Sequence, residues 1–247
     1  MKTIRVTSSR RRLVLTASGR RTWQEDRLEE HFEANNAAVV VCDVWDRHWS
    51  RGATERAGEL ALKIDAFCRR LRQAGVLIAH CPSGTMDAYK GTPARVRAQG
   101  PRVPLPRLLE APPKPFEIEN GGSDTEDAFP PNTAVWSRQH GSIEIDQDQD
   151  VITDDGDELA AYFNTTGRKV VLITGVHANL CVLDRSFGLR ALVGRGFKAI
   201  LVADLTDAMY DPAQPPYVSH EEGTALIVRY IEAFVAPITT AAKVVLA

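Results

Sequence analysis

An apolar run that passes directly into a cysteine-bearing segment, from Lys169 to Ser186, constrains the fold more than any other stretch of this chain. Residues 170–173 are all aliphatic, which is typical of a strand covered by helices on both faces of a parallel sheet. Gly175 allows a tight turn, and residues 178–180 begin a predicted helix whose first turn includes or adjoins Cys181. Ligands bind at the carboxyl ends of such strands.

The position of Cys181 at the start of a helix predicts a reactive thiol. Unpaired N–H groups and the positive end of the helix dipole favour the thiolate, which is the nucleophilic form. An isolated cysteine on an apolar helix is otherwise commonly a small buried hydrophobe. The surrounding pattern decides between these two interpretations.

That pattern is Gly-Val-x-x-Asn-x-Cys-Val, from Gly175 to Val182, and a second apolar strand, Ala38 to Cys42, ends at Asp43. Together these features resemble the isochorismatase-like cysteine hydrolases, with nicotinamidases and carbamoyl hydrolases among them. The likeness spans residues 37–234. It implies that Asp43 and Cys181 are catalytic.

The resemblance also implies a cis peptide bond before His177 and an oxyanion hole formed by the N–H groups of His177 and Cys181. The family's catalytic lysine is missing, because no lysine lies between Lys114 and Lys169. Counting back from Ser142 places Arg138 at that position, so Arg138 is the third predicted catalytic residue. The alternative is a surface arginine paired with an acid from residues 146–158.

Strands alternate with helices along the chain, which predicts an α/β fold. We expect one domain over residues 1–247, a three-layer, doubly wound and mainly parallel sheet with helices on both faces and an N-terminal β-rich extension. The predicted strands are residues 37–44, 76–80, 134–137, 170–173 and 199–203, and the predicted helices include residues 55–73, one through Phe163, and one capped by Ser219 and Glu222. Asp43 and Cys181 then meet at one sheet edge.

Two segments lie outside this alternation. Residues 1–36 are basic at first, as in a transit peptide, but the β-prone runs 3–7 and 13–16 favour a hairpin that contacts another subunit. Residues 92–133 are rich in proline and glycine and lack periodicity. Such a long excursion is typical of a lid or contact surface, with flexible surface decoration as the alternative.

Several aromatic and imidazole side chains are placed at or near the predicted strand ends. They fit a pocket that stacks a flat or ring-bearing compound, although aromatic residues there serve equally in packing. The predicted substrate-binding residues are Trp45, Trp49, His80, His140, His177 and Tyr210.

The composition limits the classes of partner that the chain is expected to bind. A net charge of -2 and a pI near 6.3 provide no attraction to nucleic acid or an anionic membrane, which favours a small-molecule substrate. No apolar stretch approaches the roughly 20 residues that span a bilayer, and we expect a soluble, cytoplasmic homo-oligomer. The cysteines lack paired spacing and are expected to be reduced: Cys42, Cys68, Cys81 and Cys181.

No cofactor is expected, although two stretches have the residue spacing of metal sites. Residues 146–157 alternate acids as a calcium loop does, but Val151 stands where that loop needs glycine, and a solvated acidic loop is the alternative. Asp46-Arg47-His48 has the Asp-x-His spacing of the zinc or iron sites of some nicotinamidase-like relatives, yet it follows the first strand instead of the second. Neither motif predicts a metal.

These patterns predict a cysteine hydrolase that cleaves a carbon–nitrogen bond of a small amide or carbamoyl compound through a thioester. Asp43 takes the thiol proton, and Arg138 holds the thiolate by charge without moving protons. Two alternatives stay open. One is vinyl-ether hydrolysis as in isochorismatase, against which the retained Cys181 argues, and the other is an inactive binding or assembly protein.

Overall fold

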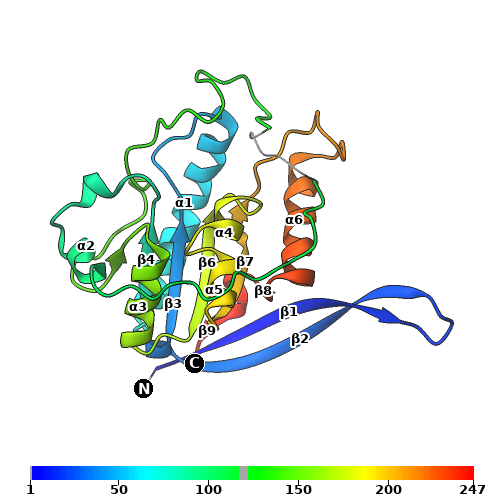
Figure 1. Cartoon of the computed structure of the whole chain (residues 1–247), viewed down its shortest axis with the longest axis horizontal. Coiled ribbons are helices and arrows are strands. Elements are labelled where there is room, and N and C mark those ends of the chain that lie inside the picture. Colours follow the sequence, from blue (N-terminus) through cyan, green and yellow to red (C-terminus); the bar gives the residue numbers. More distant parts are fainter. Residues whose placement is uncertain (1, 117–121) are drawn as a thin grey trace.

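The computed structural model describes residues 2–116 and 122–247, and a mixed sheet forms its centre (Figure 1). Five parallel strands form the part that carries the site, in the spatial order β7-β6-β3-β4-β5. They are β3 (Ala37–Cys42), β4 (Leu77–Cys81), β5 (Val151–Ile152), β6 (Val170–Val176) and β7 (Lys198–Asp207). The α/β prediction with a mainly parallel sheet is confirmed.

Helices cover both faces of the sheet because its strands are apolar on both sides. Alternate residues of β3 point to opposite faces, with Val40 in one core cluster and Val39 in the other. Helix α1 (Arg51–Arg72) packs on the Val39 side. The Val40 side is covered by α3 (Gly156–Thr165), α4 (Cys181–Asp184), α5 (Leu189–Gly194) and α6 (His220–Phe234). This is the predicted three-layer arrangement.

The two long helices begin where side chains cap them. The Ser50 hydroxyl accepts a hydrogen bond from Ala53 N, so α1 starts four residues before the predicted start at Glu55. Ser219 and Glu222 form the predicted capping box at the start of α6. Among the described residues, no helix is both long and apolar enough to cross a membrane.

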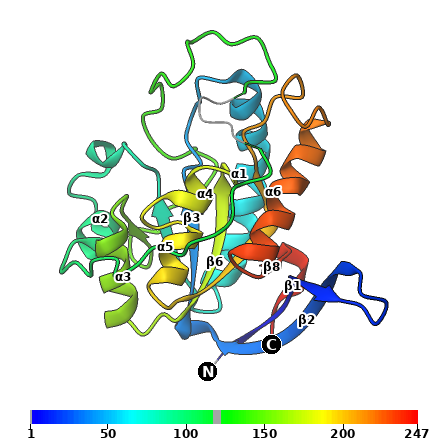
Figure 2. The same cartoon turned by 45° about the vertical axis from the view of Figure 1, so that its right-hand side comes forward.

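The N-terminal extension is a hairpin, but its strands differ from the predicted ones. Run 3–7 and residues 13–15 of the second run belong to one strand, β1 (Thr3–Leu15), and the return strand is β2 (Arg21–Glu33). The intervening polar residues stay in the ladder because cross-strand ion pairs such as Arg12–Asp26 hold them there. The hairpin extends away from the body, and both termini lie at its base (Figures 1 and 2).

Two short strands, β8 (Ile238–Thr239) and β9 (Val244–Leu246), connect the hairpin to the body. β8 lies between β1 and β7, and β9 pairs with β1. The antiparallel hairpin therefore continues the parallel sheet beyond β7.

The strand predicted at residues 134–137 is absent, and the two-residue β5 lies next to β4 instead. In this region Trp136 stacks on Trp45 at 4.3 Å, and Ser137 N donates to an Asp46 carboxylate oxygen at 2.9 Å. The Asp46 carboxylate thus accepts a hydrogen bond from a backbone N–H that would otherwise pair with a neighbouring strand. Gln139 forms only an isolated bridge with Trp45.

The excursion at residues 92–133 starts with the short helix α2 (Pro93–Ala98) and then runs over the helices on one face. Leu109 exchanges hydrogen bonds with Arg190 of α5, and Lys114 Nζ donates to Asn179 O. On its return, Asp124 pairs with Arg56 of α1 at 2.7 Å. Residues 117–121 lie outside the described part, and the role as lid or contact surface stays a prediction.

Candidate active site

Asp43 and Cys181 meet because β3 and β6 are neighbours in register. Cys42, the last residue of β3, pairs with Gly175 of β6. Gly175 has φ +105°, and a Cβ there would lie 2.0 Å from the Cys42 carbonyl oxygen, so only glycine fits. The chain then turns into α4, which begins at Cys181. The two predicted catalytic residues therefore share one edge of the sheet.

Asp43 is fully buried and has φ +49°, a left-handed conformation that turns its side chain at the strand end. One carboxylate oxygen accepts a hydrogen bond from Ser83 N at 2.6 Å. The other lies 3.0 Å from Arg185 Nε. Both oxygens thus have donors, which fix the orientation of the carboxylate.

The Cys181 thiol lies in contact with this pair. Burial raises its pKa, the negative charge of Asp43 raises it further, and Arg185 opposes both effects. The expected preference for the thiolate at a helix start is therefore not found. The helix α4 has four residues, too few for a strong dipole, and burial outweighs it.

The carboxyl and the guanidinium respond to the same environment. Burial raises the pKa of Asp43, while Arg185, Ser83 and the Cys181 thiol act to lower it. Burial disfavours the charged form of Arg185, but its contacts with the Cys181 sulfur and the Asp43 carboxyl group outweigh this and raise its pKa. The site therefore combines a thiol that burial keeps protonated with a permanent cation that pairs with Asp43.

Arg185 is the residue that the sequence interpretation missed. Arg138, which was predicted to supply the positive charge, is exposed, and its backbone binds Asp46. Among the described residues, the basic side chain paired with Asp43 is Arg185. The spacing from Cys181 to Arg185 is one helical turn, a signal that was present in the sequence.

His177 follows a cis peptide bond with Val176, as the resemblance implied. Its ring is buried, and Nε2 has no hydrogen-bond partner among the described residues. Burial lowers the pKa of His177 to about 4 and that of the neighbouring His48 to about 3. Both are therefore neutral imidazoles at pH 7, and the two rings meet edge to face with centroids 5.1 Å apart.

These imidazoles line a small cavity beside Asp43. Its volume is about 10 Å³, which is room for about one water molecule. Trp45 also lines it and donates from Nε1 to Ser83 O at 3.1 Å. Trp49 packs nearby in a cluster with Ala53.

The other predicted substrate-binding residues have structural contacts and do not line this cavity. His80 is buried between Gln139 and Asp150, at 3.0 Å from each. His140 Nδ1 accepts from Ser142 N, and the buried Tyr210 donates its hydroxyl to Gln214 O. The structure thus brings together Asp43, Trp45 and His177, with Cys181 and Arg185 in contact with Asp43.

The acidic residues of the two stretches with metal-site spacing have other partners. Asp46 accepts hydrogen bonds from the N–H and hydroxyl of Ser137, and Asp150 of the acidic loop pairs with Arg72. Among the described residues, no three His, Cys, Asp or Glu side chains are grouped to hold a metal ion.

Comparisons with known proteins support the fold. No family model and no curated protein matches the sequence. Among solved structures, the chain is similar to a cysteine hydrolase from Pseudomonas syringae pv. phaseolicola 1448A, with 16% identity, TM-score 0.52, and coverage of 86% of this chain and 92% of that one. It is also similar to an isochorismatase from Pseudomonas putida KT2440, with 14% identity, TM-score 0.54, and coverage of 87% and 92%. The chain therefore has the fold of the isochorismatase-family cysteine hydrolases.

Proposed function

We propose that the protein is a cysteine hydrolase that cleaves the carbon–nitrogen bond of a small amide or carbamoyl compound. The observation that supports this most is the buried cluster in which Asp43 contacts both Cys181 and Arg185. A nucleophilic thiol, a carboxylate that takes its proton and a cation that offsets the charge are the groups that acyl transfer requires.

In the proposed reaction, the Cys181 sulfur attacks the carbonyl carbon while the thiol proton passes to Asp43. The resulting oxyanion accepts hydrogen bonds from the N–H groups of His177 and Cys181. As the carbon–nitrogen bond breaks, Asp43 returns the proton to the leaving ammonia or amine, and a thioester forms. Water then attacks the thioester with Asp43 as base and releases the acid.

The raised pKa of Cys181 defines the order of these events. Because burial and the charge of Asp43 keep the thiol protonated, the proton moves during the attack on the substrate and not before it. Arg185 stays charged throughout and offsets the negative charge that the thiolate adds next to Asp43. A guanidinium does not give up its proton, so proton transfer depends on Asp43 alone.

The surroundings of Asp43 favour a flat, uncharged reacting group. Trp45, His48 and His177 line the cavity, and both imidazoles are neutral because burial lowers their pKa values. A planar amide or carbamoyl group stacks on these neutral rings. The substrate needs more room than this cavity offers, so we expect the nearby excursion and loop side chains to move on binding.

A screen for ammonia release across small amides, ureas and carbamoyl acids tests the proposal, with Cys181→Ala as the paired variant. We expect turnover of at least one compound by the wild type, none by the variant, and a mass increase on Cys181 equal to the acyl group when the reaction is quenched early. Isochorismate cleavage that survives Cys181→Ala would support vinyl-ether hydrolysis instead. Binding of a compound without turnover or acylation would indicate an inactive binding protein.

A further inference from the structure

The cavity beside Asp43 is lined by a polar atom that lacks a partner. His177 is 2% exposed, and its Nε2 atom forms no hydrogen bond with the residues that the structure describes. Buried polar atoms are normally paired with protein, water or a ligand, because an unpaired one keeps the full cost of its desolvation. A molecule that brings a polar group into this cavity would supply the missing partner.

His48 lines the same cavity and carries a hydrogen-bond donor. Ser50 N donates to His48 Nδ1 at 3.1 Å, so Nδ1 is the ring nitrogen without a proton. Burial lowers the pKa of His48 to about 3, and the neutral ring therefore holds its proton on Nε2. Within the described part of the chain, no acceptor binds this N–H. His48 is thus able to donate to a bound molecule.

Arg47 adds a positive charge to this cavity. It is exposed, yet it lines the cavity together with Asp43 and His48. Among the described residues, no carboxylate forms an ion pair with its guanidinium. Arg185 is already paired with Asp43 at 3.0 Å. Of these two arginines, only Arg47 is left to bind a ligand.

Two acids near these donors form their hydrogen bonds elsewhere. Asp46 accepts from the N–H and the hydroxyl of Ser137, at 2.9 and 2.6 Å. Asp127, which interacts electrostatically with His48, accepts from Arg51 N at 2.9 Å. The guanidinium and the imidazole N–H therefore remain available to an acceptor from outside the chain.

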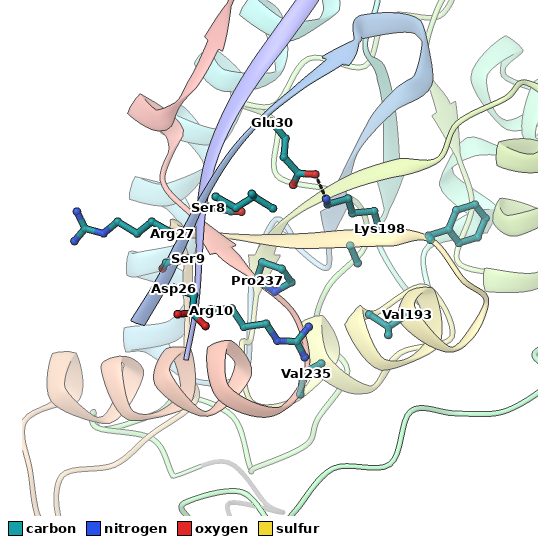
Figure 3. Close-up of a pocket in the computed structure, with 13 residues that line it drawn as sticks. Ser8, Ser9, Arg10, Asp26, Arg27, Glu30, Val193, Lys198, Val235 and Pro237 are labelled. Carbon is teal, nitrogen blue, oxygen red and sulfur yellow. Dashed lines mark hydrogen bonds and ion pairs between the residues drawn. The ribbon is translucent and has the colours of Figure 1, made fainter. Parts of the chain in front are cut away.

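A larger pocket elsewhere does not compete for this role. Its volume is about 620 Å³, and it lies between the hairpin of β1 and β2 and the body (Figure 3). Its residues do not belong to the catalytic cluster, and its Lys198 pairs with Glu30. A group that holds the substrate next to the reacting atoms must therefore lie in the cavity beside Asp43.

We propose that Arg47 and His48 bind a carboxylate of the substrate, so that the protein acts on small amides or carbamoyl compounds that carry this group. The inference rests on the proposed hydrolysis and names its substrate class. A guanidinium and an imidazole N–H are donors that suit a carboxylate. Burying a carboxylate is costly, which favours the exposed Arg47 as its place. The neutral amide then faces Asp43 and provides a partner for His177 Nε2.

Matched pairs of an acid and its alcohol test the inference. The pairs are carbamoylglycine with hydroxyethylurea, succinamate with hydroxybutyramide, and carbamoylbenzoate with hydroxymethylbenzamide. Within a pair, a hydroxymethyl group replaces the carboxylate and the amide stays the same. We expect kcat/KM for at least one acid to exceed that for its alcohol by about 10- to 100-fold, as a charge-assisted contact provides.

Variants of the two donors locate the contact. Arg47→Met should raise KM for the acid by about the same factor and change kcat little, because the contact is made equally before and during the reaction. Arg47→Lys should keep part of the preference, since the charge remains. His48→Phe keeps a ring but removes the N–H, and should raise KM less. Arg51→Met is the matched control, because Arg51 is exposed but does not line the cavity; it should leave the preference unchanged.

Calorimetric binding of the same compounds to Cys181→Ala separates this inference from the proposed function. Tighter binding of an acid than of its alcohol, lost when Arg47→Met is added, would support the carboxylate site even without turnover by the wild type. Turnover that treats acids and alcohols alike, or a preference that Arg47→Met leaves unchanged, would overturn the inference while hydrolysis stands. No turnover, together with no preference for the acids in binding, would overturn both.

Discussion

Arg185 Nε lies 3.0 Å from an oxygen of the buried Asp43 carboxylate, and the same guanidinium acts on the Cys181 thiol. This pairing places a fixed positive charge next to both the proposed base and the proposed nucleophile. It arises because α4 is a single turn, so that Arg185, which follows its last residue, lies next to the end of β3. The chain thus has a cation at the site although no lysine is available there.

Replacing Arg185 by methionine is expected to reduce turnover strongly, because the thiolate that forms beside Asp43 then lacks its counter-charge. Arg185→Lys should retain part of the activity, since the charge remains. Arg138→Met is the matched control, because Arg138 is exposed and pairs through its backbone with Asp46; it should stay close to wild type. Steady-state rates for the three variants check this. A large loss in Arg138→Met with little change in Arg185→Met would reverse the assignment.

The pH–rate profile provides a second readout of the same pair. Burial raises the pKa of Asp43 in the free protein, so the acidic limb of kcat/KM should lie above the ordinary aspartate value of about 3.9. Arg185 acts to lower that pKa, and Arg185→Met should therefore move the limb to still higher pH. An unchanged limb in this variant would mean that Asp43 does not control the profile.

Asp43→Asn is expected to lower kcat by about 10² to 10⁴ while substrate binding changes little, because the amide keeps the shape but cannot take the proton. Binding measured by calorimetry separates the two effects. Activity within about tenfold of wild type would show that another group moves the proton.

Alkylation by iodoacetamide should modify Cys181 before the other cysteines. Cys42, Cys68 and Cys81 are fully buried, whereas Cys181 is partly exposed. Because burial and Asp43 raise the pKa of Cys181, its alkylation rate should still increase above about pH 10.5, where an ordinary thiol with a pKa of about 8.5 has reached its plateau. Mass spectrometry of peptides over a pH series measures both points. A plateau near pH 7 would instead indicate a stable thiolate at rest.

Asp150 is expected to contribute to stability and not to catalysis. Burial alone raises its pKa, but hydrogen bonds from His80 and Arg72 outweigh this and hold the pKa below the usual range. Its stabilising effect is then complete above the unfolded-state pKa of about 3.9 and is lost as the pH falls through the lower folded-state value.

Asp150→Ala should therefore lower the free energy of unfolding at pH 7 by about 3 to 5 kcal/mol, as expected when a buried ion pair loses one partner. Asp148→Ala, at an exposed position in the same loop, is the control and should change it by less than about 0.5 kcal/mol. Urea titrations at pH 7 and at low pH compare the two variants. Equal effects would show that the buried pair of Arg72 and Asp150 does not stabilise the fold.

The local pattern of the chain was sufficient to predict the central strands, the helices on both faces, and the meeting of Asp43 with Cys181. Aliphatic runs, glycine turns and capping residues act over a few positions, and parallel strands bring their carboxyl ends to one edge whatever the sequence distance. The cis bond before His177 followed from the family pattern.

Only the tertiary structure decided which cation joins Asp43, which histidines line the cavity, and that residues 134–137 form no strand. These outcomes depend on contacts between distant segments: Arg185 reaches Asp43 across 142 positions, and His80 reaches Asp150 across 70. The ionisation state of Cys181 belongs to the same group. Burial controls its pKa, and burial is set by the packing of the whole fold around the thiol, which no local pattern contains.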